Sequence, residues 1–99
     1  MLVSEVTQEQ IDAWKKEYGD LKKVHVGSKS CILKKPSRKA LSYATVAAQT
    51  DPLKYNEIIL EDCWLAGDEE IKTDSGLFLS LSAHLTELVG MVEVEMVNL

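Results

Sequence analysis

The sequence lacks any apolar run long enough to cross a membrane. A membrane-spanning helix needs about 20 consecutive apolar residues, and no such run occurs in the 99 residues. Residues 1–5 also lack the basic flank and the apolar centre of a signal peptide. We therefore expect a cytoplasmic protein that makes no membrane contact.

Cysteine and histidine are scarce, and each occurs only twice, as Cys31, Cys63, His25 and His84. None of the four has a second ligand at the spacing of a zinc site. Both cysteines lie in apolar stretches, where a reduced thiol behaves as a small hydrophobic side chain. The glycines form neither of the two common phosphate-binding motifs. The sequence thus predicts free thiols, no metal and no cofactor.

A catalytic constellation is also missing. Ser80, His84 and Glu87 have the spacing of neighbours on one helical face. Nucleophilic catalysis further requires an oxyanion site and a pocket, and neither is indicated. A solvated helix face explains the three residues, so we predict that the protein is not an enzyme.

Composition indicates one folded domain over residues 1–99, since 45% of the residues are hydrophobic and 27% are charged. The charge is uneven. Residues 15–39 contain nine of the eleven basic residues and two acidic ones, whereas residues 51–99 contain eleven acidic residues and two lysines. Such a division keeps a domain soluble, orients like copies head to tail, or steers a charged partner.

The first half predicts a helix, a hairpin and a second helix. Thr7 and Gln10 fit a capping box, and Gly19 suits the end of that helix. Residues 21–34 alternate around Gly27-Ser28, as in a β-hairpin. Ser37 is then expected to cap a helix whose core face is small, formed by Ala40, Leu41, Ala44, Ala47 and Ala48.

The second half predicts two more helices and a strand. Asp51-Pro52 begins a helix that we expect to end at Gly67, and residues 68–74 read as a polar connection. A fourth helix is expected from Asp74 or Ser75 to about Val89. Residues 92–97 alternate apolar and acidic side chains, as in a half-buried strand. That strand either adds to the hairpin edge, where its glutamates would meet lysines, or pairs with another molecule.

The expected fold class is therefore α+β, a β-hairpin plus a C-terminal third strand packed against about four short helices. Two features point to binding. Arg38 and Lys39 oppose the macrodipole at a helix start, which suggests that they meet a carboxylate. The fourth helix is so apolar that it is either central in the fold or shared with a partner.

Residues 33–89 resemble the small tail assembly chaperones of long-tailed bacteriophages and prophages. A strand ends in a basic-Pro-Ser-Arg step at residues 35–38, and an Asp-Pro-started helix leads into the acidic-Cys segment of residues 60–65. A polar connection at residues 66–71 then precedes a final apolar helix, residues 77–89.

The resemblance implies a protein, in the host cytoplasm if phage-encoded, that coats the helical tape-measure protein and helps to recruit tail-tube subunits. It implies no catalytic residues, and we expect a homo-oligomer. The candidate partner-binding residues are Lys35, Arg38, Lys39, Leu77, Phe78, Leu81, Leu85 and Leu88. The alternatives are a small oligomeric adaptor or regulatory module and, less favoured, a nucleic-acid-binding protein that uses residues 22–39. No aromatic residue lies among residues 19–42 to stack on bases.

Overall fold

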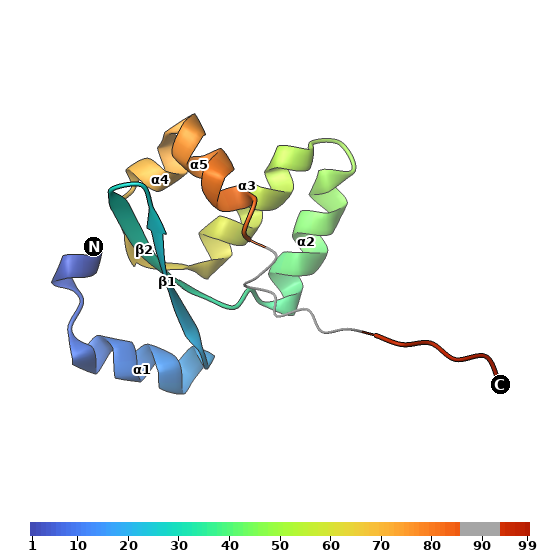
Figure 1. The fold of residues 1–99 in the computed structure, drawn as a ribbon, viewed down its shortest axis with the longest axis horizontal. Coiled ribbons are helices and arrows are strands. Elements are labelled where there is room, and N and C mark those ends of the chain that lie inside the picture. The colour runs from blue at the N-terminus through green and yellow to red at the C-terminus, as the bar shows by residue number, and fades with distance from the viewer. Residues whose placement is uncertain (86–93) are drawn as a thin grey trace.

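The computed structural model describes residues 1–85 and 94–99. Its sheet has three antiparallel strands in the order β1-β2-β3 (Figure 1). Their bounds are Leu21–Val26 for β1, Lys29–Lys34 for β2 and Trp64–Gly67 for β3. The predicted α+β class is confirmed, as is the hairpin at residues 21–34.

The hairpin turns at Gly27, whose φ of 62° is the glycine-first signature of a type II′ turn. Val26 pairs with Lys29 across this turn, and Val24 pairs with Cys31 two residues further on. Residues that face each other in an antiparallel pair project to the same side of the sheet. The turn therefore directs Val24, Val26 and Cys31 to one face.

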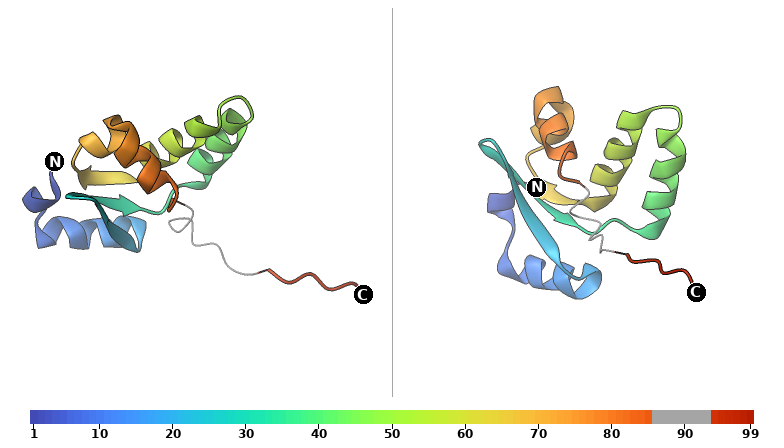
Figure 2. Two further views of the ribbon diagram at one scale, coloured as in Figure 1. Left: turned by 45° about the horizontal axis from the view of Figure 1, so that its top comes forward. Right: turned by 45° about the vertical axis from the view of Figure 1, so that its right-hand side comes forward.

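The N-terminal segment packs beside the sheet through η1, Val3–Glu5, and α1, Gln8–Tyr18. The predicted capping box is present: the Thr7 hydroxyl accepts from the Gln10 N–H at 3.2 Å, and the Gln10 side chain accepts from the Thr7 N–H at 3.2 Å. Gly19, with φ 84°, follows the helix as predicted. Figure 2 shows α1 on one side of the sheet and α3, α4 and α5 on the other.

Helices α2, Arg38–Ala48, and α3, Pro52–Cys63, form an antiparallel pair (Figure 1). Both predicted N-caps are confirmed, because Ser37 accepts from the Ala40 N–H at 3.1 Å and Asp51 accepts from the Leu53 N–H at 3.1 Å. Ala44 is fully buried. The small core face of α2 therefore does bring it close to its neighbours.

The predicted end of α3 is wrong. The helix stops at Cys63, and residues 64–67 form β3 against β2 instead of a last helical turn. The apolar spacing continues through Trp64, so a local pattern favours helix there, but pairing with a strand 30 residues earlier satisfies the same backbone groups.

Gly67 is required by this pairing. A Cβ at this position would lie 2.5 Å from the Cβ of Cys31, and its φ is 154°. Its N–H donates to the Met1 carbonyl at 2.7 Å, so the N-terminus lies against β3. The residue that we expected to end a helix instead permits the close approach of two backbones.

The connection after β3 contains a short helix, α4, Glu70–Thr73, which the sequence did not predict. Its Ile71 is fully buried. Helix α5, Ser75–Ser82, is capped by Asp74 as predicted, but it ends before Val89. His84 and Leu85 donate to the carbonyls three residues earlier, so the last described turn is tighter than an α-helix.

The core lies between the sheet and the helices that follow β2 in the chain. Its buried residues come from β1, β2, helices α2 to α5 and the turn after α5. They are Val26, Cys31, Leu33, Ala44, Ile59, Leu60, Cys63, Ile71, Leu81 and Leu85. Ile32 and its partner Ala66 are buried on the opposite face.

The predicted C-terminal strand is not seen where the chain is described. Residues 94–97 have no regular secondary structure, and residues 92 and 93 lie outside the described residues. The third strand is β3 instead. Among residues 1–85 and 94–99, no helix has the length and apolarity needed to span a membrane.

Candidate protein-binding surfaces

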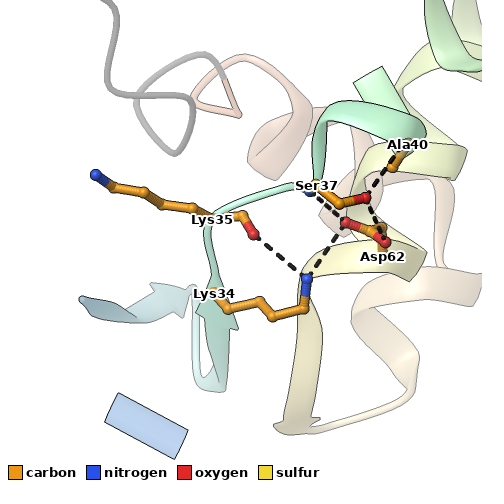
Figure 3. Close-up of polar contacts among 5 residues, drawn as sticks. All are labelled: Lys34, Lys35, Ser37, Ala40 and Asp62. Atoms are coloured by element: carbon orange, nitrogen blue, oxygen red, sulfur yellow. Dashed lines mark hydrogen bonds and ion pairs between the residues drawn. The ribbon is translucent and has the colours of Figure 1, made fainter. Parts of the chain in front are cut away.

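Asp62 joins three segments where β2 passes into α2. Its carboxylate accepts from the Ser37 N–H at 2.9 Å and from the Lys34 ammonium at 3.3 Å (Figure 3). The Ser37 hydroxyl donates to the same carboxylate at 3.4 Å. A carboxylate at a helix N-terminus also interacts favourably with the helix dipole. This cluster holds α2 against the end of α3, so its role is structural.

The basic residues around this cluster point elsewhere. Figure 3 shows the Lys35 side chain directed away from Asp62. Lys35, Arg38 and Lys39 are all exposed, and none of them forms an ion pair within the described part of the chain. Among the described residues, the contact expected between a carboxylate and Arg38 or Lys39 is not formed, because the nearby Asp62 binds Lys34 and Ser37 instead. Lys35, Arg38 and Lys39 are exposed to solvent.

Some basic residues of the first half form ion pairs with acidic residues of the second half. Lys29 pairs with Asp68 at 3.3 Å and Glu70 at 3.4 Å, and Lys34 pairs with Asp62. The Asp68 pKa is lowered, chiefly because its carboxylate accepts the Glu70 N–H at 3.0 Å. Lys29 and Lys34 are thus partly neutralised, which reduces the basic surface that residues 22–39 offer to phosphates.

A groove of about 840 Å³ lies between β1 and α5. We call it the β1–α5 groove, and its lining includes Lys22, Lys23, Val24, Leu77, Leu81 and Leu85. β1 is an edge strand, so one side of its backbone has no strand partner among the described residues. The groove thus combines an open strand edge with apolar side chains and two lysines, and Asp74 is the one acidic residue in the described part of its lining.

The candidate leucines in α5 and in the turn after it contribute mostly to the core. Leu81 and Leu85 are 4% and 3% exposed and belong to the core. Leu77 and Phe78 are half-buried against that core, and Leu88 lies outside the described residues. Leu77, Leu81 and Leu85 line the β1–α5 groove, whereas Lys35, Arg38 and Lys39 do not. The candidate residues therefore lie on two separate surfaces.

The second surface includes apolar residues that were not among the candidates. Tyr43 and Val46 are 68% and 66% exposed on α2. With Lys39 they follow a spacing of four and three, so the three side chains share one helix face. We call this face the α2 outer surface. The signal was present, because large apolar residues opposite a small-residue core face have no place inside the domain.

Ser80 and His84 line the β1–α5 groove together with His25, whereas the two cysteines are buried. Burial raises the pKa of Cys31 to about 11 and, together with neighbouring Asp62, that of Cys63 to about 12, so both thiols stay protonated. Ser80 donates its hydroxyl to the Gly76 carbonyl at 2.8 Å. Glu87 lies outside the described residues. Within residues 1–85 and 94–99, no three potential ligands lie together to hold a metal ion.

Binding is the chemistry that these surfaces support best, since they offer apolar side chains, cations and an open strand edge. Searches of protein-family models, of curated proteins and of solved structures found no match to this chain.

Proposed function

We propose that this protein is a non-enzymatic assembly chaperone of the phage tail type, which binds a tape-measure protein and recruits tail-tube subunits. The observation that carries the proposal is the α2 outer surface, where Tyr43 and Val46 are two-thirds exposed beside Lys39. Exposed aromatic and aliphatic side chains next to cations are typical of protein contacts.

The chemistry of this surface specifies the client contact. Arg38 and Lys39 have no acidic partner in the described part of the chain, so they are available to carboxylates of another molecule. Tyr43 and Val46 lie one helical turn apart, which suits packing against a second helix. The fitting partner is therefore an amphipathic helix whose apolar stripe is flanked by acidic residues, and a tape-measure protein supplies helices over a long distance.

A contact made by a few side chains of one helix is weak when a single copy binds alone. A long client with repeated helices binds many copies, and linked copies gain avidity without any new contact. The proposal therefore expects many copies of the chain for each client molecule. An adaptor that bridges two proteins would instead form complexes of small, fixed stoichiometry.

The test is co-expression of the chain with the tape-measure protein of its own genome, followed by size exclusion with light scattering. We expect co-elution in many copies per client, and loss of co-elution in a Tyr43→Ser/Val46→Ser variant. The matched control is Leu79→Ser, which removes a 51% exposed apolar side chain from α5. A chain that ignores the client, or a double variant that still binds it fully, overturns the proposal.

Nucleic acid is separated from protein in the same experiment by nuclease treatment before chromatography. If nuclease treatment makes the complex dissociate, and DNA or RNA alone changes the elution of the chain in a salt-sensitive manner, the basic segment of residues 22–39 is the functional surface instead.

A further inference from the structure

We propose that the β1–α5 groove receives the C-terminal segment of a second copy of this chain, so that copies associate head to tail by adding a strand to the open edge of β1. This goes beyond client binding, because it concerns the chain alone and uses a different surface from the α2 outer surface.

The acceptor is the outer edge of β1. Val26 and Lys29 close a two-residue turn and form a hydrogen-bonded pair, and such pairs alternate along an antiparallel ladder. Lys22 and Val24 therefore bond to β2, while Lys23 and His25 direct their backbone N–H and C=O groups outward. An extended segment can pair with these groups, as in strand addition to an exposed sheet edge.

The donor is the end of the chain. Residues 94–99 run away from the rest of the molecule (Figure 1). Val94, Met96 and Val97 are 73%, 92% and 72% exposed. The sequence of residues 92–96 alternates valine or methionine with glutamate, so an extended conformation places Val94 and Met96 on one face and Glu95 on the other. One face of such a strand has to be covered.

Acceptor and donor match in charge and in polarity. Lys22 and Lys23 form no ion pair among the described residues, and neither does Glu95. A docked strand would place its apolar face toward Val24 and Leu81 and its glutamates on the opposite face, where Lys23 lies, while Lys22 flanks the apolar face. The division of charge along the chain is then explained, because the basic part of one copy meets the acidic end of the next.

A second copy is favoured over the chain's own end. Leu85 lines the groove, and residues 94–99 of the same chain point away from the molecule rather than back along β1 (Figure 1). Each copy has one acceptor and one donor on different parts of its surface. Such heterologous contacts produce rings or open chains of copies.

The experiment uses the full chain alone, without client. Light scattering at increasing concentration is expected to give masses rising above 11.0 kDa in steps of one copy. Two variants each lose one side of the contact: Lys22→Glu/Lys23→Glu at the acceptor and Val94→Ser/Met96→Ser at the donor. Each substitution changes exposed side chains, and circular dichroism checks that the variant is folded.

Each variant alone is expected to associate at least about tenfold more weakly than the original chain. An equimolar mixture of the two is expected to form 1:1 dimers and nothing larger, because only one intact acceptor and one intact donor remain. A monomer at all concentrations overturns the inference, as do oligomers that survive loss of the donor. A donor variant that lowers thermal stability without changing mass shows docking within one chain, which also overturns it. None of these outcomes depends on whether a client is bound.

Discussion

Helices α5 and α2 show that the apolar content of a helix does not predict how much apolar surface it exposes. Helix α5 is the more apolar by sequence, yet Leu81 is buried, and Leu77 and Phe78 pack against the core. Helix α2 has a core face of small residues, yet Tyr43 and Val46 are two-thirds exposed. The two most exposed large apolar side chains of these helices thus lie on α2, the less apolar one, although Leu79 of α5 is also 51% exposed.

Packing neighbours explain the difference. Helix α5 lies against β1 and next to α4, so the face that carries Leu77, Phe78 and Leu81 is covered. Helix α2 packs mainly against α3, and a helix with one neighbour buries only the stripe that faces that neighbour. Ala44 marks that stripe. Whatever large apolar side chains lie on the other side of α2 remain in solvent.

The largest expected effect is at α5. Leu81→Ala should lower the free energy of unfolding by about 2–5 kcal/mol, because it leaves a cavity in the core. Leu79→Ala on the same helix is the control and should change it by no more than about 0.5 kcal/mol, since Leu79 is 51% exposed. Urea unfolding measures both. Equal losses for the two variants would contradict the described packing of α5.

The inner face of α2 should respond to added volume. Ala44→Leu is expected to cost about 1–3 kcal/mol, because the fully buried alanine leaves no room for a larger side chain. Ser42→Leu adds the same side chain to an exposed position of α2 and is the control. A tolerated Ala44→Leu, with an unfolding midpoint like that of the control, would show that α2 does not pack tightly on this side.

The sequence predicted those parts of the fold that depend on neighbouring residues. The caps at Thr7, Ser37, Asp51 and Asp74 each depend on a side chain and a backbone N–H no more than three residues away, and all four are present. The hairpin turn is similarly local. These features follow from hydrogen bonds between residues close in the chain, and residue type and spacing are enough to predict such bonds.

The parts that failed depend on contacts between distant segments. Residues 64–67 continue the helical spacing of α3, and only the presence of β2 makes them a strand. The same holds for the candidate residues, because exposure is set by which elements pack together. The sequence offered Leu81 as a candidate partner-binding residue on a helix either central in the fold or shared with a partner, and it did not single out Tyr43. The packing buries Leu81 and leaves Tyr43 exposed.

The attachment of α2 to the rest of the domain gives an intermediate effect. Asp62→Ala removes the acceptor for Ser37 and the partner of half-buried Lys34, and should cost about 1–3 kcal/mol. Asp62→Asn keeps an acceptor oxygen for the Ser37 N–H and should cost less. If thermal unfolding of Asp62→Ala matches that of the original chain, this cluster does not hold α2 in place.

The smallest effect on stability is expected at the α2 outer surface. Tyr43→Ser/Val46→Ser should change the free energy of unfolding by no more than about 1 kcal/mol, since surface substitutions contribute about 0.5 kcal/mol each. Both side chains are about two-thirds exposed and so lose little packing, and serine is close to both in helix propensity. An unchanged m-value in urea unfolding would show that the variant exposes as much surface on unfolding as the original chain does. A loss as large as that of Leu81→Ala would mean that Tyr43 and Val46 stabilise the domain itself. A variant that keeps its stability but no longer binds a client would separate the binding surface of this protein from its core.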